Sequence, residues 1–125
     1  MSLQIRVDLA SGVPPYEQIR GQVTALVAAG VLTEGERLPT VRDLASDLAV
    51  ATGTVQRAYR ELEASGVVTS RRRLGTVVAQ VPGSPRGTRQ LAARFVAEAR
   101  AGGLDDEAIL DLVRGALMSA PERAT

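Results

Sequence analysis

Apolar residues recur at helical spacing in two neighbouring segments of the first half of the chain. Each segment has apolar residues at positions i, i+3, i+4 and i+7, which places them on one face of a helix. Because only a few residues separate the segments, the pattern predicts two short helices joined by a tight turn. The residues are Val41, Leu44, Ala45 and Leu48 in the first segment, and Val55, Ala58, Tyr59 and Leu62 in the second.

Residues at the ends of these segments are typical helix caps. Thr40 and Asp43 have the spacing of a capping box, in which the hydroxyl and the carboxylate each bond a free backbone N–H group. Thr52 is the expected N-cap of the second helix of the pair, and Gly66 is the residue expected to end it. The turn between the helices is then expected at residues 49–51.

Two short runs of β-branched residues follow, at 67–69 and 76–78, with an arginine-rich loop between them. This pattern predicts a β-hairpin in which Gly75 supplies a positive φ at the turn. A helix-turn-helix followed by a hairpin is a winged helix-turn-helix, whose second helix enters the major groove of DNA. The predicted fold class is therefore mainly α with a small β-hairpin.

Two further elements are predicted before the helix-turn-helix. Apolar and polar residues alternate over 3–7, which predicts a short half-buried strand. Pro15 suits the first turn of a helix predicted for 16–29, and Gly30 is its expected C-terminal cap. This helix has no strongly basic face, so we expect it to support the core, and residues 31–39 are expected to form a turn.

The last third of the chain predicts two more helices, separated by a break at Gly102 and Gly103. Thr88 is a candidate cap for the first of them, and Asp105 for the second. Because two helices are too small to bury both apolar faces alone, we expect these faces to meet a second copy of the chain. The residues expected at this dimer interface are Leu91, Phe95, Val96, Ile109, Leu110, Leu112, Val113 and Leu117.

These elements predict four parts of the chain. A winged helix-turn-helix DNA-binding domain is expected over 1–81, and residues 82–87 have the proline and glycine content of a linker. A helical dimerisation region is expected over 88–119, followed by a tail over 120–125. A two-fold dimer would present two recognition helices to successive major grooves, about 34 Å apart.

Composition gives little support to an enzyme. The chain has 125 residues with no cysteine and no histidine, so it lacks a thiolate nucleophile, the most common general base and the usual metal ligands. Its carboxylates are scattered at the spacing of solvated helix faces. We therefore predict no catalytic residue, no metal and no cofactor. No apolar run could span a bilayer and the N-terminus is unlike a secretory signal, so a cytoplasmic protein without a membrane partner is expected.

Net charge alone does not indicate a nucleic-acid partner, because 15 basic residues are matched by 14 acidic ones. The distribution is more informative, since the stretch 70–81 contains Arg71, Arg72 and Arg73 and no acid. These arginines are expected to contact phosphates or the minor groove. The alternative is a charged hairpin tip that only aids solubility. Every basic residue is arginine, which either suits phosphate and guanine contacts or reflects genomic base composition.

The polar face of the second helix of the pair holds the other candidate contacts. Gln56 and Arg57 are the candidate base-reading residues, since glutamine can bind adenine and arginine can bind guanine through two hydrogen bonds. The alternative for both is a solvated helix face. Thr52 and Thr54 could donate to phosphate oxygens or only cap the helix. Gly53 either permits close approach of a DNA backbone or simply removes a contact.

The motifs of residues 5–80 together resemble the GntR family of bacterial transcription regulators, and its short YtrA-like branch in particular. The combination of LPTVRDLA, TVQRAY and a glycine-containing wing is specific. The similar stretches are Pro15–Arg20, Gly30–Leu32, Gly35–Arg42, Leu44–Ala45, Thr54–Tyr59, Leu62–Gly66 and Gly75–Val78.

The resemblance implies a winged-helix DNA-binding domain followed by a short two-helix region that serves dimerisation. It also implies that Arg42, which matches a DNA-contacting arginine of the family, binds DNA; the alternative is a surface arginine paired with an acid. The chain departs from the family at Gly53, where a polar residue is usual, and at Arg73, where glycine is usual. Both positions face DNA in the family.

The sequence therefore predicts a sequence-specific DNA-binding transcriptional regulator that acts as a dimeric repressor on a double-stranded operator. A small-molecule effector could bind between the dimer helices and the winged domain, but the sequence identifies none. The alternative is a winged-helix module that binds another protein and not DNA. The basic wing and the outward arginine of the second helix argue against that alternative.

Overall fold

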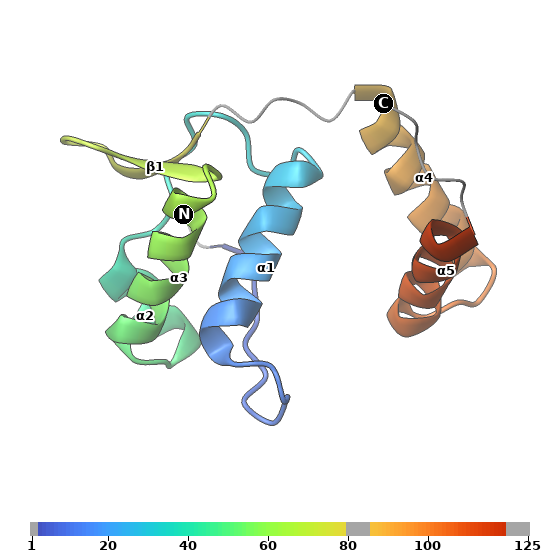
Figure 1. Ribbon diagram of the computed structural model, residues 1–125, viewed down its shortest axis with the longest axis horizontal. Coiled ribbons are helices and arrows are strands. Elements are labelled where there is room, and N and C mark those ends of the chain that lie inside the picture. Colours follow the sequence, from blue (N-terminus) through green and yellow to red (C-terminus); the bar gives the residue numbers. More distant parts are fainter. Residues whose placement is uncertain (1–2, 80–85, 120–125) are drawn as a thin grey trace. The chain divides into compact units, whose positions relative to one another are not determined.

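The computed structural model describes residues 3–79 and 86–119. The chain divides into two compact units, Met1–Ser84 and Pro85–Thr125, which we call the winged unit and the helical unit. The elements, shown in Figure 1, are α1 (Pro15–Ala28), α2 (Val41–Leu48), α3 (Thr52–Ala64), β1 (Val68–Arg71), β2 (Gly75–Val78), α4 (Arg86–Ala101) and α5 (Asp106–Ser119). The predicted fold class, mainly α with a small hairpin, is confirmed.

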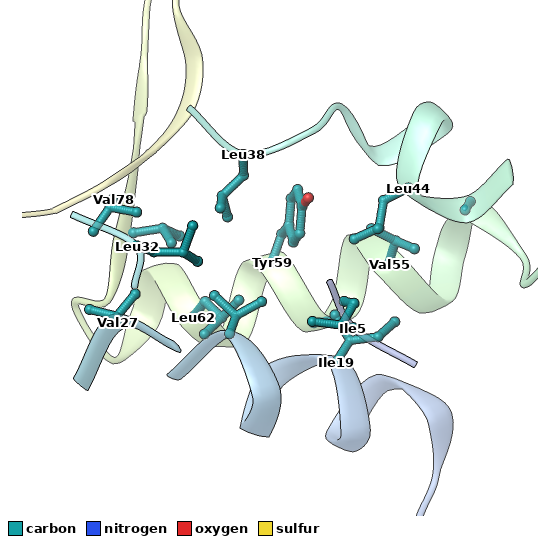
Figure 2. Close-up of a cluster of buried hydrophobic side chains, with 14 residues drawn as sticks. Ile5, Ile19, Val27, Leu32, Leu38, Leu44, Val55, Tyr59, Leu62 and Val78 are labelled. Atoms are coloured by element: carbon teal, nitrogen blue, oxygen red, sulfur yellow. The ribbon is translucent and has the colours of Figure 1, made fainter. Parts of the chain in front are cut away.

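The core of the winged unit is built around α3, which contacts α1, α2 and β1. Figure 2 shows Ile19 from α1, Leu44 from α2 and Leu62 from α3 in a single cluster of apolar side chains. The helical spacing predicted the positions of Leu44 and Leu62, because apolar residues that recur every turn lie on the face that meets the neighbouring helices. All four predicted apolar residues of α3 are buried, namely Val55, Ala58, Tyr59 and Leu62.

Tyr59 combines apolar packing with one satisfied polar group. Its side chain is 6% exposed, and its hydroxyl donates to the carbonyl oxygen of Pro39 at 2.7 Å. Burial raises the pKa of the Tyr59 phenol, so the neutral form that donates this bond is the one that the fold favours. The bond ties α3 to Pro39, two residues before the start of α2, and the prediction that Tyr59 belongs to the core is confirmed.

The caps of the helix-turn-helix agree with the sequence at one end and differ at the other. The Thr40 hydroxyl accepts from the N–H of Asp43 at 3.1 Å, so Thr40 is confirmed as the N-cap of α2. The reciprocal bond predicted from the Thr40 N–H to the Asp43 carboxylate does not form among the described residues. The prediction for Thr52 is wrong, because Ala51 is the N-cap of α3 and Thr52 is already its first helical residue. Ala51 has the extended backbone of an N-cap but no side chain that could bond the free N–H groups.

The wing is an antiparallel hairpin of β1 and β2, and the segment before α2 is also hydrogen-bonded to β2. Val68 pairs with Val78 at its base and Arg71 pairs with Gly75 at its tip, as the two β-branched runs predicted. The segment before α2 runs alongside β2: the Leu38 N–H donates to the Thr76 carbonyl at 2.9 Å, and the Val78 N–H donates to the Glu36 carbonyl at 2.8 Å. The sequence predicted only a turn in this segment.

The strand predicted over residues 3–7 is wrong. Residues 3–7 pair with no strand among the described residues, although Ile5 is buried at 6% exposure. Side-chain amides of α1 take the place of a neighbouring strand. Gln22 accepts from the Arg6 N–H at 3.0 Å and donates to the Arg6 carbonyl at 2.6 Å, and Gln18 accepts from the Asp8 N–H at 2.8 Å.

The helical unit consists of α4 and α5. α4 is already helical at Arg86, so the predicted cap at Thr88 is wrong; most of the predicted linker, 82–87, lies outside the described residues. The predicted cap of α5 is confirmed, since the Asp105 carboxylate accepts from the Ala108 N–H at 2.9 Å. In the described part of the chain, no helix has both the length and the apolar character needed to cross a membrane.

The apolar faces of the helical unit remain largely uncovered within the unit. Ile109 is its one buried hydrophobic residue among those described, at 7% exposure, and Val96 is half-buried. Ile109 is therefore covered inside the unit, unlike most of the residues grouped with it in the sequence. The others stay open: Leu91 is 57% exposed, Phe95 37%, Leu110 46%, Leu112 51%, Val113 41% and Leu117 72%.

Candidate nucleic-acid interface

The exposed face of α3 lies opposite its buried residues, as helical periodicity requires. Gly53, Gln56, Arg57 and Arg60 are all exposed on this face. Burial of Val55, Ala58, Tyr59 and Leu62 fixes the rotation of α3 about its axis, so the polar residues cannot turn inward. Thr52 is exposed and Thr54 is half-buried at the start of the helix, where backbone N–H groups have no partner within the helix.

Gly53 has no structural reason of its own to be glycine. It lies in the first turn of α3 without a positive φ, and a Cβ atom added there would meet nothing within 4 Å. Glycine in a helix is destabilising by roughly 0.5–1 kcal/mol relative to alanine. Among the described residues, no contact and no backbone conformation requires glycine at position 53.

Arg57 does not extend freely into solvent. Its guanidinium carbon lies 3.7 Å from the centre of the Tyr16 ring, and its Nη2 donates to the Tyr16 hydroxyl at 3.1 Å. Its Nε donates to the Glu61 carboxylate at 3.4 Å, one turn further along α3. Tyr16 is half-buried and packs against the core, while its ring also contacts Arg57.

A short network of charges continues from Arg57 along α1. Arg20 bonds Glu17 at 2.9 Å and lies 3.7 Å from Glu61. The hydrogen bond from Arg20, aided by the positive charges of Arg20 and Arg57, lowers the pKa of the Glu17 carboxyl below its ordinary value. The same hydrogen bond raises the pKa of Arg20. Glu17 and Arg20 are therefore both charged at neutral pH. Arginine and glutamate side chains alternate along the network.

Arg42 lies in the first turn of α2 and is exposed. No acidic side chain among the described residues lies within ion-pair distance of it, so the alternative of a surface arginine held by an acid finds no support there. The neighbouring N–H groups of the α2 N-terminus carry a partial positive charge that favours anions. The arginine and the helix end therefore suit the same kind of ligand, a phosphate.

The tip of the wing carries three exposed arginines in a strained turn. Arg71, Arg72 and Arg73 are exposed and none pairs with an acid in the described part of the chain. Arg73 has φ 71° and Gly75 has φ 85°, so two residues of the tip adopt left-handed backbone. The positive φ predicted for Gly75 is confirmed. The positive φ of Arg73 gives a physical reason for the glycine that the resemblance leads us to expect there.

The candidate DNA contacts thus come from three places in the winged unit. They are the first turn of α2, the exposed face of α3 and the tip of the hairpin. The described residues contain no group of His, Cys, Asp or Glu side chains arranged to hold a metal ion. The sequence found the exposed arginines but missed the support that Tyr16 gives Arg57, because nothing in the pattern links residues 41 positions apart.

Two packed helices followed by a basic two-stranded wing define the winged helix-turn-helix class of proteins. The family described as "Bacterial regulatory proteins, gntR family" matches residues 15–78, which include all of these elements. The HTH-type transcriptional regulator Rv1152 of Mycobacterium tuberculosis is similar, with 47% identity over 100 residues that cover 80% of this chain and 83% of that protein. The chain therefore belongs to the gntR family.

The branch within the family is shown by two further similarities. The HTH-type transcriptional repressor YtrA of Bacillus subtilis is 38% identical over 76 residues, which cover 61% of this chain and 58% of that protein. The structure of YtrA from Sulfolobus acidocaldarius, a GntR-family transcription factor, has a TM-score of 0.57 at 29% identity and covers 93% of this chain and 98% of its own. The chain is a YtrA-like helix-turn-helix transcriptional regulator with a DNA-binding winged helix.

Proposed function

We propose that this protein is a sequence-specific DNA-binding repressor that acts as a homodimer. The observation that carries the proposal is the set of exposed arginines without acidic partners among the described residues, on α2 and on the wing, beside the exposed face of α3. An exposed positive group gains little from the protein itself, whereas a DNA backbone supplies closely spaced phosphates. The operator is the partner that this distribution of charge fits.

The candidate residues divide into two roles under this proposal. Gln56 and Arg57 would read base edges in the major groove, because α3 is the second helix of the helix-turn-helix. Arg42, the first turn of α3 and the wing would hold the protein on the phosphates. Phosphate contacts fix position and orientation, and base contacts provide specificity. The residues assigned to the phosphates are Arg42, Thr52, Gly53, Thr54, Arg71, Arg72, Arg73 and Gly75.

The helical unit would supply the dimer interface. Phe95 of α4 lines a shallow apolar groove with Leu112, Val113, Ala116 and Leu117 of α5. A second copy of the same face would cover these side chains, and an interface related by two-fold symmetry uses the same patch on both copies. Two linked winged units would then bind two half-sites, which raises affinity without new contacts. Leu91, Val96 and Leu110 would extend this surface, and Ile109 would support it from inside the unit.

A dimer bound across an operator would block access of the transcription machinery to that DNA, and a relative of the same branch is named a transcriptional repressor. A regulator that binds the chromosome would work in the cytoplasm. A small-molecule effector could act on the dimer, but the chemistry of the described residues identifies no effector class.

Selection of genomic DNA fragments on the full chain, followed by sequencing, tests the proposal. The recovered duplex should bind more tightly than a scrambled duplex of equal length. Arg57→Ala should reduce this preference by about tenfold, because one base contact is lost. Arg72→Ala should weaken binding to both duplexes and reduce the salt slope by about 1. Arg6→Ala removes an equal charge from an exposed residue outside the proposed interface and should change neither quantity.

Two outcomes would contradict the proposal. If no fragment is enriched at low salt, or if Arg57→Ala and Arg72→Ala both leave affinity unchanged, the protein does not use this face for DNA. The winged unit would then be a protein-binding module.

A further inference from the structure

We propose that Tyr16 is a positioning residue that fixes the guanidinium of Arg57 for base reading. The inference rests on the proposed function and names how one specificity residue is held. Tyr16 lies in the first turn of α1, outside the helix-turn-helix, and its ring lies against the arginine of α3. The carbon of the guanidinium is 3.7 Å from the ring centre, which is the spacing of a cation–π contact.

The contacts of Arg57 restrain it without using all of its donors. A guanidinium has five N–H groups, and here one Nε–H goes to Glu61 and one Nη2–H goes to the Tyr16 hydroxyl. About three N–H groups therefore remain, whereas a guanine edge needs two. The Arg57 side chain is 54% exposed, so these donors are open to a ligand.

The chemistry of the support also preserves the positive charge of Arg57. Tyr16 is neutral, so it can hold the guanidinium by its ring face without cancelling the charge that DNA would attract. Glu61 is the one acid paired with Arg57 among the described residues, and it is shared with Arg20, which lies 3.7 Å away. The bond from Arg57 to Glu61 is long, at 3.4 Å. Tyr16 is therefore the main restraint on the guanidinium, and Glu61 is the weaker one.

Restraint before binding has a definite effect on affinity. A free arginine side chain samples many rotamers and loses that freedom when it contacts a base. A side chain that is already stacked in one arrangement loses less freedom, so the contact it makes is tighter. The opposite possibility is sequestration, in which Tyr16 holds Arg57 away from DNA and lowers its affinity. The two readings predict changes of opposite sign when the ring is removed.

A double-mutant cycle on the full chain separates these readings. The probe is the duplex recovered from genomic selection, with a scrambled duplex for comparison. Tyr16→Leu should reduce the preference for the selected duplex by about fivefold, which corresponds to the strength of an exposed cation–π contact. Tyr16→Phe keeps the ring face and should stay within about twofold of the parent protein. In a chain that already carries Arg57→Ala, Tyr16→Leu should have no further effect.

The binding of Tyr16→Leu decides whether Tyr16 positions Arg57. Equal or tighter binding by Tyr16→Leu, or an equal loss in the presence of Arg57→Ala, would overturn the positioning role. If the parent protein enriches no fragment, the proposed function fails as well; if it enriches fragments and Tyr16→Leu matches it, only the positioning role fails. Binding to the scrambled duplex and its salt slope should not change, whereas a general loss of folding would alter both.

NMR of the free protein tests the contact between Tyr16 and Arg57 without DNA. The Nε–H resonance of Arg57 should be shifted by the Tyr16 ring in the NMR spectrum of the free protein. The shift should persist in Tyr16→Phe and vanish in Tyr16→Leu. An Arg57 resonance that is unaffected by either substitution would show that the ring does not hold the guanidinium in solution.

Discussion

The winged unit buries the apolar faces of its helices, whereas the helical unit leaves most of its apolar residues exposed. In the winged unit, Leu44 and Leu62 are 1% and 0% exposed, on two different helices. In the helical unit, Leu112 and Val113 are 51% and 41% exposed, although they also lie on an amphipathic helix. An apolar helix face therefore shows where burial is needed, but it does not show whether the same chain covers that face.

The size of each unit explains this difference. Three helices and a hairpin surround a common interior, so each apolar face of the winged unit has a partner within the unit. Two helices have no third layer, and one side of each apolar face stays open. We therefore expect the winged unit to be stable by itself and the helical unit to be stabilised by a second copy.

The largest effect is expected from Leu62→Ala, which should lower the free energy of unfolding of the winged unit by about 3 kcal/mol. Leu62 is fully buried, and its loss leaves a cavity among the helices that meet α3. Denaturant unfolding at two protein concentrations measures the change. The loss should be the same at both concentrations, and a loss that depends on concentration would contradict the self-sufficiency of this unit.

Val113→Asp should separate the proposed dimer and weaken operator binding by about 100-fold, because two linked half-sites become one. A carboxylate in the apolar groove would be buried without a partner if the dimer formed. Sedimentation and duplex titration measure the two effects. Met118→Asp is the matched control, because Met118 is 88% exposed and periodicity places it on the opposite side of α5. If the parent protein is monomeric, or if both variants have the same oligomeric state and operator affinity, the helical unit does not need a second copy and the proposed contrast with the winged unit is wrong.

Arg73→Gly should stabilise the winged unit by about 1 kcal/mol, because glycine adopts the left-handed backbone without strain. The same change should weaken DNA binding and lower the salt slope by about 1, since a charge leaves the wing. Thermal unfolding should show the gain in stability, and titration of DNA at several salt concentrations should show the loss of affinity. Arg72→Gly removes an equal charge from a neighbour without a positive φ, so it should weaken binding with no gain in stability.

The smallest effect is expected from Gly53→Ala. The open space around Gly53 leads us to expect a gain of about 0.5 kcal/mol in stability from helix propensity alone. If the glycine admits a DNA backbone, the added methyl group should reduce operator affinity while the protein becomes more stable. Unchanged affinity for the selected duplex would mean that Gly53 only removes a contact.

Local patterns predicted those parts of the fold that local physics determines. The spacing of Val55, Ala58 and Leu62 sets the buried face of α3, and the Thr40 hydroxyl caps α2 through an N–H three residues away. These features depend on neighbours in sequence, and they are confirmed. The hairpin is confirmed for the same reason, since its strands are separated by only three residues.

The features that sequence missed depend on distant partners. Alternation over 3–7 is typical of a strand, but the Gln22 side chain of α1 bonds the backbone of Arg6, and the Gln18 side chain bonds that of Asp8 just beyond. The pairing of Leu38 with Thr76, and the contact of Tyr16 with Arg57, also join residues far apart in sequence. The candidate DNA contacts were identified by charge and residue type, and the structure adds their exposure and their support.

The hydrogen bond from the Leu38 N–H to the Thr76 carbonyl joins two parts of the proposed interface, the wing and the segment that leads into α2. Leu38 is hydrogen-bonded to the second strand of the wing, and Thr40, two residues later, caps the helix that carries Arg42. The distance between Arg42 and the arginines of the wing is thereby set by the protein backbone. Under the proposed function, this fixed distance would match one spacing of phosphates along a groove, and DNA with a different groove width would contact fewer of these arginines.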